Sequence, residues 1–265
     1  MNTLNAGALL AGIARTNVQL YNQLLEQGRS ESDLDLIRSA YELAAQLYAG
    51  AYQADGKPFV VHVVSVASAV ALLGQPSRFV ATALVHNVYN NGDFGDGKQR
   101  DDGARRRRVL RAALGSEVEE LVRRFAELRI DRNLDSLLAR CDAMTEVDRN
   151  LVVMDLADLL EKHLDRGVLY FGQSRWVTRF SFDNVDELRR LATALGEPVL
   201  GQALAEAIAS ARDSVVPGAL RSDPARKYLR FIAPLSHRKR WRVVLQQRIY
   251  QPLRTRLGRL KRRLA

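Results

Sequence analysis

The chain has 265 residues, of which 47% are hydrophobic and 26% are charged. This composition is typical of a globular protein, so it excludes wholesale disorder, a collagen-like repeat and a disulfide-stapled miniprotein. The single cysteine, Cys141, cannot form an internal disulfide, and no segment has the roughly 18 consecutive apolar residues that a membrane-spanning helix needs. The N-terminus also lacks the basic start of a signal peptide, and together these features predict a cytoplasmic protein.

The net charge of +10 is unevenly distributed along the chain. Residues 225–265 hold 14 of the 40 Lys and Arg residues and none of the 30 acidic residues, which leaves residues 1–224 with 26 basic residues and a net charge of −4. A mildly acidic body therefore carries a strongly basic tail.

Apolar residues recur at spacings of three and four along most of the body, which is the pattern of helices that face a core. The predicted helices cover residues 2–27, 33–52, 59–73, 78–89, 105–114, 116–128, 134–143, 148–165, 180–195 and 199–211. No segment shows the alternating pattern of a strand, so the predicted fold class is all-α. Residues 90–103 are rich in Gly, Asn and Asp and are predicted to form a loop.

Two of the four histidines lie in strongly apolar predicted helices. His62 lies in the first, and His86, followed by Asn87, lies near the end of the second. Helical bundles build metal sites from one inward-facing imidazole or carboxylate on each of several helices. A core histidine that bonds to a backbone carbonyl is the alternative interpretation for each of them.

Five short blocks in the same order make a more specific pattern. They are an Ala-rich helix (residues 40–52), G-K-P-F at 56–59 with His62 three residues later, A-T-A-L-V-H-N at 81–87, G-S-E-V-E-E-L-V at 115–122 and L-A-D at 156–158. This text resembles the HD superfamily of metal-dependent phosphohydrolases and, within it, the Rel/Spo alarmone hydrolases. The resemblance implies an HD-type helical bundle, which we place over residues 30–212. The helical pattern before it and the basic segment after it predict an N-terminal helical extension (1–29) and a basic amphipathic tail (213–265).

The resemblance also implies a metal site. It makes His62, His86 and Asp158 ligands of a divalent ion such as Mn²⁺, Fe²⁺ or Zn²⁺, and Asn87 stands where the superfamily has its defining metal-binding Asp. A neutral amide oxygen is a weaker ligand than a carboxylate, so we expect weaker metal binding than in the family.

Other residues depart from the alarmone hydrolases. Asn90 and Asn91 replace the Glu-Asp pair that activates water in that family, Gln53 and Ala54 lie where it has a basic residue, and residues 159–162 read L-L-E-K in place of R-L-H-N. The chain is therefore not expected to hydrolyse ppGpp by the family's mechanism. The charges at residues 161, 162 and 165 predict an exposed helix end, which excludes the neighbouring His163 from the site.

The Gly-rich loop after His86 offers replacement carboxylates. Asp93 and Asp96 are the candidate catalytic bases, and a merely flexible loop is the alternative. Two functional hypotheses follow. One is a metal-dependent phosphohydrolase-like enzyme that acts on a phosphorylated small molecule or nucleotide. The other is a catalytically inactive HD-fold binding or scaffold protein at the cytoplasmic membrane surface. The H-N-V-Y…G-D-F-G text resembles an HD-like branch loosely associated with bacterial surface-polysaccharide loci, which implies a link to surface-polysaccharide synthesis.

The tail supports the membrane hypothesis. Within residues 238–265, leucine or isoleucine recurs every three or four positions from Leu245, Arg and Lys fill most other positions, and Trp241 lies near the start. This pattern predicts a helix on an anionic membrane surface, which would place the protein peripherally on the inner face of the membrane. Nucleic acid is the competing partner, and packing against the body is the third alternative.

Overall fold

The computed structural model describes residues 4–96, 100–170, 175–221 and 229–232. The chain divides into two compact units, residues 1–230 and residues 231–265, and the account below concerns the first. The predicted membrane-binding segment, residues 238–265, lies outside the described residues.

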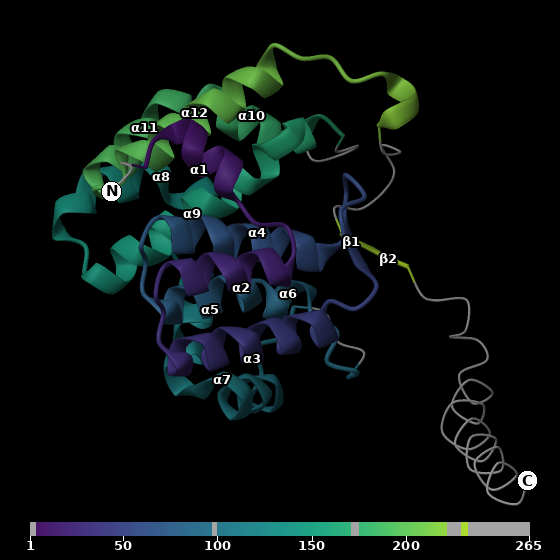
Figure 1. The fold of residues 1–265 in the computed structure, drawn as a ribbon. Coiled ribbons are helices and arrows are strands. Elements are labelled where there is room, and N and C mark those ends of the chain that lie inside the picture. The colour runs from purple at the N-terminus through teal and green to yellow at the C-terminus, as the bar shows by residue number, and fades with distance from the viewer. Residues whose placement is uncertain (1–3, 97–99, 171–174, 222–228, 233–265) are drawn as a thin grey trace, which may run out of the picture. The chain divides into compact units, whose positions relative to one another are not determined.

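Helices make up almost all of the regular structure in the described part of the chain (Figure 1), which confirms the predicted all-α class. The helices are α1 (Ala6–Gly12), α2 (Asn17–Glu26), α3 (Glu31–Leu47), α4 (Phe59–Leu72), α5 (Ser77–Val85), α6 (Val88–Asn91), α7 (Ala104–Phe125), α8 (Ile130–Arg140), α9 (Glu146–His163), α10 (Arg175–Asp183), α11 (Val185–Ala194) and α12 (Pro198–Arg212). Short 3₁₀ segments cover Cys141–Ala143, Leu164–Tyr170 (η2) and Gly218–Leu220. A small two-stranded sheet, which sequence periodicity does not predict, pairs β1 (Ala51–Gln53) with β2 (Leu229–Phe231).

Helix boundaries differ from the prediction where local capping decides them. The predicted helix over residues 2–27 is two helices, because Thr16 and Gln19 form a reciprocal capping box that starts α2 anew. The predicted break at residue 115 is a kink inside α7, where Gly115 adopts a φ of 84°. The predicted helix over residues 180–195 is divided between α10 and α11 at Asn184.

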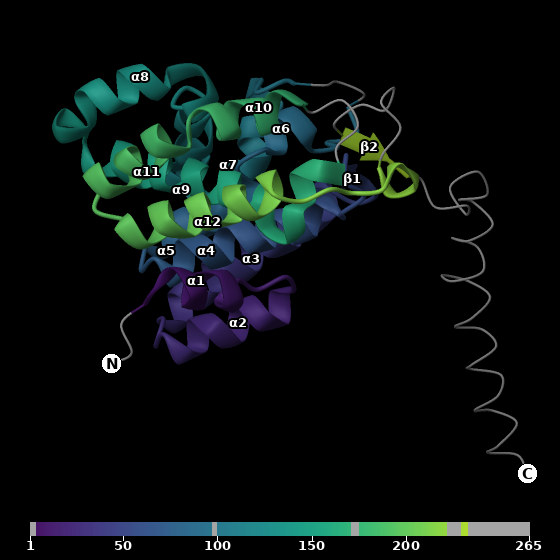
Figure 2. The ribbon, with the colours of Figure 1, turned by 90° about the horizontal axis from the view of Figure 1, so that it is seen from above.

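The centre of the unit is built around α4 and α9. Helix α4 is apolar on all sides and packs against α2, α5 and α9, so nearly all of its side chains are buried. Residues 151–163 of α9 are also buried, because α4, α5 and α7 cover one side of this helix and α12 and η2 cover another. Figures 1 and 2 show α9 lying beside α4 and α12. Polar side chains on these two helices are therefore shielded from solvent.

The N-terminal helices pack directly on this centre. Helix α1 contacts α4 and α12, and α2 contacts α3 and α4. The division into an extension (1–29), an HD-like domain (30–212) and a tail (213–265) stays a prediction. No helix in the described ranges is long and apolar enough to cross a membrane.

Candidate metal centre

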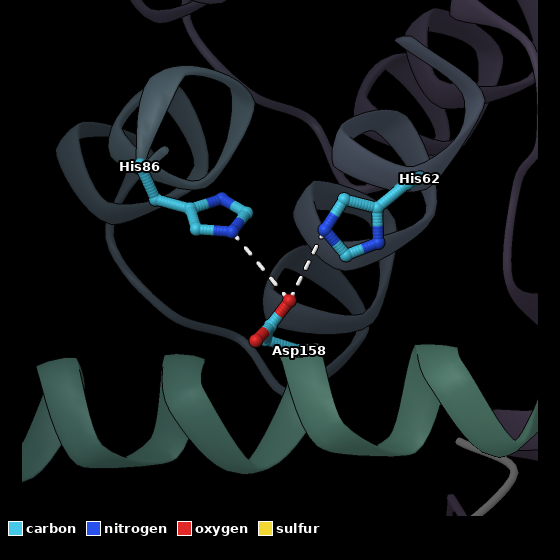
Figure 3. Close-up of side chains that lie close together, drawn as sticks. All are labelled: His62, His86 and Asp158. Carbon is cyan, nitrogen blue, oxygen red and sulfur yellow. Dashed lines mark ion pairs between the residues drawn. The ribbon is translucent and has the colours of Figure 1, made fainter. Parts of the chain in front are cut away.

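Three elements far apart in the sequence bring His62, His86 and Asp158 together (Figure 3). His62 lies one turn into α4, which starts directly after Pro58. His86 is the C-cap of α5, and Asp158 lies in the buried stretch of α9. The two histidines and the aspartate that the sequence predicts as ligands thus meet at one point of the core.

The candidate ligand atoms converge on one carboxylate oxygen. His62 Nε2 lies 3.1 Å and His86 Nε2 lies 3.5 Å from Asp158 Oδ1. One ligand atom from each residue lies within 4.8 Å of the other two, and all three residues are at most 4% exposed. Figure 3 shows both rings directed at the same oxygen.

Each imidazole is oriented through its other nitrogen. His62 Nδ1 bonds to Glu161 Oε2, and His86 Nδ1 lies 2.7 Å from the carbonyl oxygen of Ala83. An acceptor at Nδ1 fixes the ring and favours the tautomer with a lone pair on Nε2, which is how metal-binding histidines are held. Asp158 Oδ1 is buried and has no partner of hydrogen-bond geometry among the described residues. Two imidazole nitrogens and one carboxylate oxygen are therefore brought together, and this donor set fits a divalent metal ion when both imidazoles are neutral.

Asp158 and Glu161 are held in their ionised form. Burial raises the pKa of Asp158, but the Lys162 ammonium and both histidines outweigh burial and hold that pKa well below its usual range. Burial also opposes ionisation of Glu161, yet His62 and Lys57 lower its pKa to about 2. Burial lowers the pKa of His86, which keeps this ring neutral. The site thus supplies negative charge and a neutral imidazole to a cation.

The protonation of His62 is set by its two carboxylate neighbours. Burial lowers the pKa of this imidazole, but Glu161 and Asp158 raise it by more, so the net shift is upward. The negative charges of Glu161 and Asp158 therefore favour either a proton on His62 or a metal cation between the two histidines and Asp158.

Asn87 lies at the edge of this cluster. Its Nδ2 lies 2.6 Å from His86 Nε2, and the residue is half-buried. A half-turn of the amide exchanges its nitrogen and oxygen, which would direct the carbonyl oxygen at the same place. The role of Asn87 as a fourth ligand stays a prediction.

The prediction of an exposed helix end after Asp158 is wrong. Glu161 and His163 are each 1% exposed and Lys162 is 6% exposed, because η2 and α12 pack over the last turns of α9. Lys162 Nζ pairs with Asp158 Oδ2, and Lys57, from the turn before α4, pairs with Glu161. Sequence reasoning missed these residues, although Glu161 and Lys162 follow Asp158 by three and four positions and so share its side of the helix.

Arg129 extends this charged network at the start of α8. Its Nη1 lies 3.3 Å from Asp155 Oδ1 and 3.6 Å from Asp158 Oδ2, and Asp155 also accepts a 2.7 Å hydrogen bond from the Ile130 amide. Asp158 therefore lies between basic groups on one side and the two histidines on the other.

Asp93 and Asp96 have different surroundings from each other. Asp93 is exposed and accepts a 2.8 Å hydrogen bond from the amide of Gly95. Asp96 accepts two hydrogen bonds, of 2.9 and 2.7 Å, from Arg106, a guanidinium that is 1% exposed and lies 4.6 Å from the centre of the Phe94 ring. Asp96 thus fastens the loop to α7. Neither aspartate belongs to the three-residue cluster, and their catalytic role stays a prediction.

Comparisons with known proteins give a partial match. Residues 43–132, about a third of the chain, match a family described as "Domain of unknown function (DUF6817)", a span that includes His62 and His86 but ends before Asp158. The chain is 30% identical over 64 residues to "Bifunctional (p)ppGpp synthase/hydrolase RelA" of Mycobacterium tuberculosis (24% of this chain, 9% of that protein). It is also 30% identical over 64 residues to "Probable GTP pyrophosphokinase" of Mycobacterium bovis (24% of this chain, 8% of that protein).

The chain thus spans less than a tenth of the length of these curated relatives. The similarity is distant and local, and it links the chain to RelA-type proteins of nucleotide metabolism.

Proposed function

We propose that this chain binds a divalent metal ion through His62, His86 and Asp158 and is a phosphohydrolase-like enzyme with an altered active site. The observation that carries the proposal is the meeting of two imidazole Nε2 atoms at one buried carboxylate oxygen that accepts no hydrogen bond from a described residue. When bound there, a divalent ion supplies Lewis acidity toward a phosphoryl oxygen and lowers the pKa of a bound water. Glu161 holds the His62 ring in place for this role.

We propose a phosphorylated small molecule or a nucleotide other than ppGpp as the substrate. The relatives' names refer to (p)ppGpp and GTP, and the local similarity to them supports a phosphorylated substrate. Asn90 and Asn91 lack the acidity of a water-activating pair, and this difference argues against ppGpp. Asp93 is the preferred base, since it is exposed and forms no ion pair with a described residue, whereas Asp96 is bound to Arg106.

The second candidate is a catalytically inactive HD-fold protein that binds or scaffolds at the cytoplasmic membrane surface. The Lys162 ammonium favours it, because this group already places a positive charge against Asp158. Under this proposal residues 238–265 bind anionic lipid, and the association with surface-polysaccharide synthesis is part of the same hypothesis. Flotation with phosphatidylglycerol vesicles, but not with phosphatidylcholine vesicles, would support it. Binding to duplex DNA in place of vesicles would contradict it.

The decisive experiment for the enzyme proposal is elemental analysis of the full chain purified without chelators. We expect about one equivalent of Mn, Fe or Zn. His86→Ala should lose the metal, and His163→Ala, which truncates a buried histidine outside the cluster, should retain it. Absence of metal from the wild-type chain after reconstitution with excess ion would refute the proposal.

Turnover separates the two candidates once metal is found. The metal-loaded chain should release phosphate from at least one member of a panel of nucleotides and sugar phosphates. Asp93→Asn should slow that release by about 100-fold or more, while the metal content stays the same. A metal-loaded chain that hydrolyses no phosphoester would favour the inactive protein. Unchanged turnover in Asp93→Asn would remove Asp93 from the proposal.

A further inference from the structure

A cavity lies at the C-terminal end of α9, and its lining does not include the three-residue cluster. Its volume is about 720 Å³, which is within the range of small-molecule sites. Residues at the end of α9, in η2, near the end of α12 and in the segment after it line the cavity, as do Leu10 and Arg15. None of His62, His86 and Asp158 is among the lining residues.

One wall contains a buried hydrogen-bond acceptor without a partner. His163 is 1% exposed, and its Nδ1 lies 2.9 Å from the carbonyl oxygen of Leu159, to which it donates. Its Nε2 is buried and bonds to no described residue. Burial lowers the pKa of this imidazole to about 4, so Nε2 carries a lone pair at neutral pH. A buried acceptor of this kind is stabilised when a ligand donates a hydrogen bond to it.

The mouth of the cavity carries an arginine with unused hydrogen-bonding capacity. Arg166 is exposed, donates from Nε to Ser210 Oγ at 3.2 Å, and forms no ion pair with a described residue. Arg15, the other arginine of the lining, is paired with Asp165. The terminal nitrogens of Arg166 are therefore suited to a carboxylate or phosphate, which a guanidinium binds through two parallel hydrogen bonds.

The backbone at Asp165 and Arg166 has an unusual conformation. Asp165 has a φ of 53° and Arg166 a φ of 62°, so two consecutive residues other than glycine adopt the left-handed conformation. L-residues rarely adopt it, and such conformations persist where the surrounding structure fixes them. Here they turn the chain sharply after α9, so that His163 and Arg166 line the same cavity.

We propose that this cavity binds a small hydroxylated anion of the sugar-phosphate class, with Arg166 pairing with the anionic group and His163 Nε2 accepting a hydrogen bond from a hydroxyl. The lining is mixed. Ser210, Ser214 and Tyr170 add hydroxyl groups for the sugar, six lining residues are apolar, and the two lining carboxylates are Asp165, which is paired with Arg15, and Glu206. This site is separate from the metal centre, so its occupation does not depend on the proposed enzyme activity.

The test is titration of the full-length, ¹⁵N-labelled protein with ribose 5-phosphate, followed through the imidazole nitrogens of His163. We expect the Nε2 signal to move as the hydroxyl bonds to it. Ribose alone can make only the hydrogen bond to His163, and inorganic phosphate alone lacks the sugar hydroxyl that the proposal places against His163. Each should therefore bind at least about tenfold more weakly than ribose 5-phosphate.

Two variants isolate the two contacts. His163→Leu removes the unpartnered acceptor but keeps an apolar side chain in the wall, so it should fold and should lose at least about tenfold in affinity for ribose 5-phosphate. Arg166→Gln should lose as much, whereas Arg132→Gln, which removes an exposed arginine of α8 outside the cavity, should bind like the wild type.

Two outcomes would overturn the proposal. The first is a His163 Nε2 chemical shift that does not change on addition of ribose 5-phosphate up to millimolar concentration. The second is equal binding of inorganic phosphate and ribose 5-phosphate with no effect of His163→Leu, which would reduce the cavity to a surface that attracts anions without recognising them.

Discussion

Replacement of Lys162 by Met tests whether an internal ammonium competes with a metal ion for Asp158. Lys162 Nζ pairs with Asp158 Oδ2, and the two side chains are 6% and 1% exposed. Removal of one partner from a buried ion pair typically costs about 3 to 5 kcal/mol of unfolding free energy, because the other charge stays buried. Arg129 Nη1, 3.6 Å from the same oxygen, and His62 Nε2, 3.1 Å from Oδ1, compensate in part.

We therefore expect a loss near the lower limit, about 3 kcal/mol, which corresponds to a fall in Tm of about 6 to 12 °C for a unit of this size. The uncompensated carboxylate should in turn bind a cation more tightly. A tenfold gain in Mn²⁺ affinity corresponds to about 1.4 kcal/mol of binding free energy. This is less than half of the roughly 3 kcal/mol that the unpaired Asp158 carboxylate costs and that a bound cation could recover. Addition of Mn²⁺ should thus restore more of the Tm in Lys162→Met than it adds to the wild type.

The assay is thermal unfolding with and without MnCl₂, combined with calorimetric titration of Mn²⁺. Lys57→Met is the matched control, because Lys57 pairs with Glu161 and not with Asp158, and its Mn²⁺ affinity should stay close to that of the wild type. Equal Mn²⁺ affinities for the wild type and Lys162→Met would refute the competition between ammonium and metal. If Lys162→Met does not fold without metal, Lys162→Gln keeps a hydrogen-bond donor and permits the same comparison.

Two further predictions concern stability. Arg106→Met should destabilise the unit by about 3 kcal/mol, because Arg106 is buried and forms an ion pair with Asp96. In urea unfolding, the effects of Arg106→Met and Asp96→Asn should be strongly non-additive in the double variant. The pKa of His163 is about 4 in the folded protein and 6.5 in the unfolded chain. Above pH 6.5 the imidazole is neutral in both states and does not change the free energy of unfolding, but that free energy falls as the pH drops from 6.5 to 4, because the unfolded chain binds the proton more tightly. Relative to His163→Leu, the wild type should lose about 3 kcal/mol over that interval, and parallel pH profiles of the two proteins would contradict this.

The helices were predictable from local pattern, and the three residues of the candidate metal centre were predictable from the resemblance of short motifs to the HD superfamily. A helix that is apolar on every side must be buried, and α4 therefore carries His62 into the core. The order of the motifs around His62, His86 and Asp158 then indicated one site, and the structure brings these residues together. Helix ends were less predictable, since the capping box at Thr16 and the kink at Gly115 decide them within a few residues.

The roles of charged side chains were not predictable from spacing. Arg106 lies in a run of four arginines, and only the position of Asp96 and Phe94 in the folded loop makes it the buried member. Asp93 and Asp96 read as equivalent loop carboxylates, but their surroundings separate them into an exposed group and a structural ion pair.

The sequence by itself determined an all-α protein with two histidines and an aspartate on separate helices, because helical periodicity and short motifs are properties of neighbouring residues. Only the tertiary structure decided that Glu161, Lys162 and His163 are buried, because α12 and η2, which follow them in the chain, cover the end of α9. Burial turns these three residues from a solvated helix end into a carboxylate that orients His62, an ammonium paired with Asp158, and an imidazole acceptor without a partner among the described residues. The physical reason is that the cost of a charge or a polar atom depends on what surrounds it in space, and local sequence does not specify those surroundings.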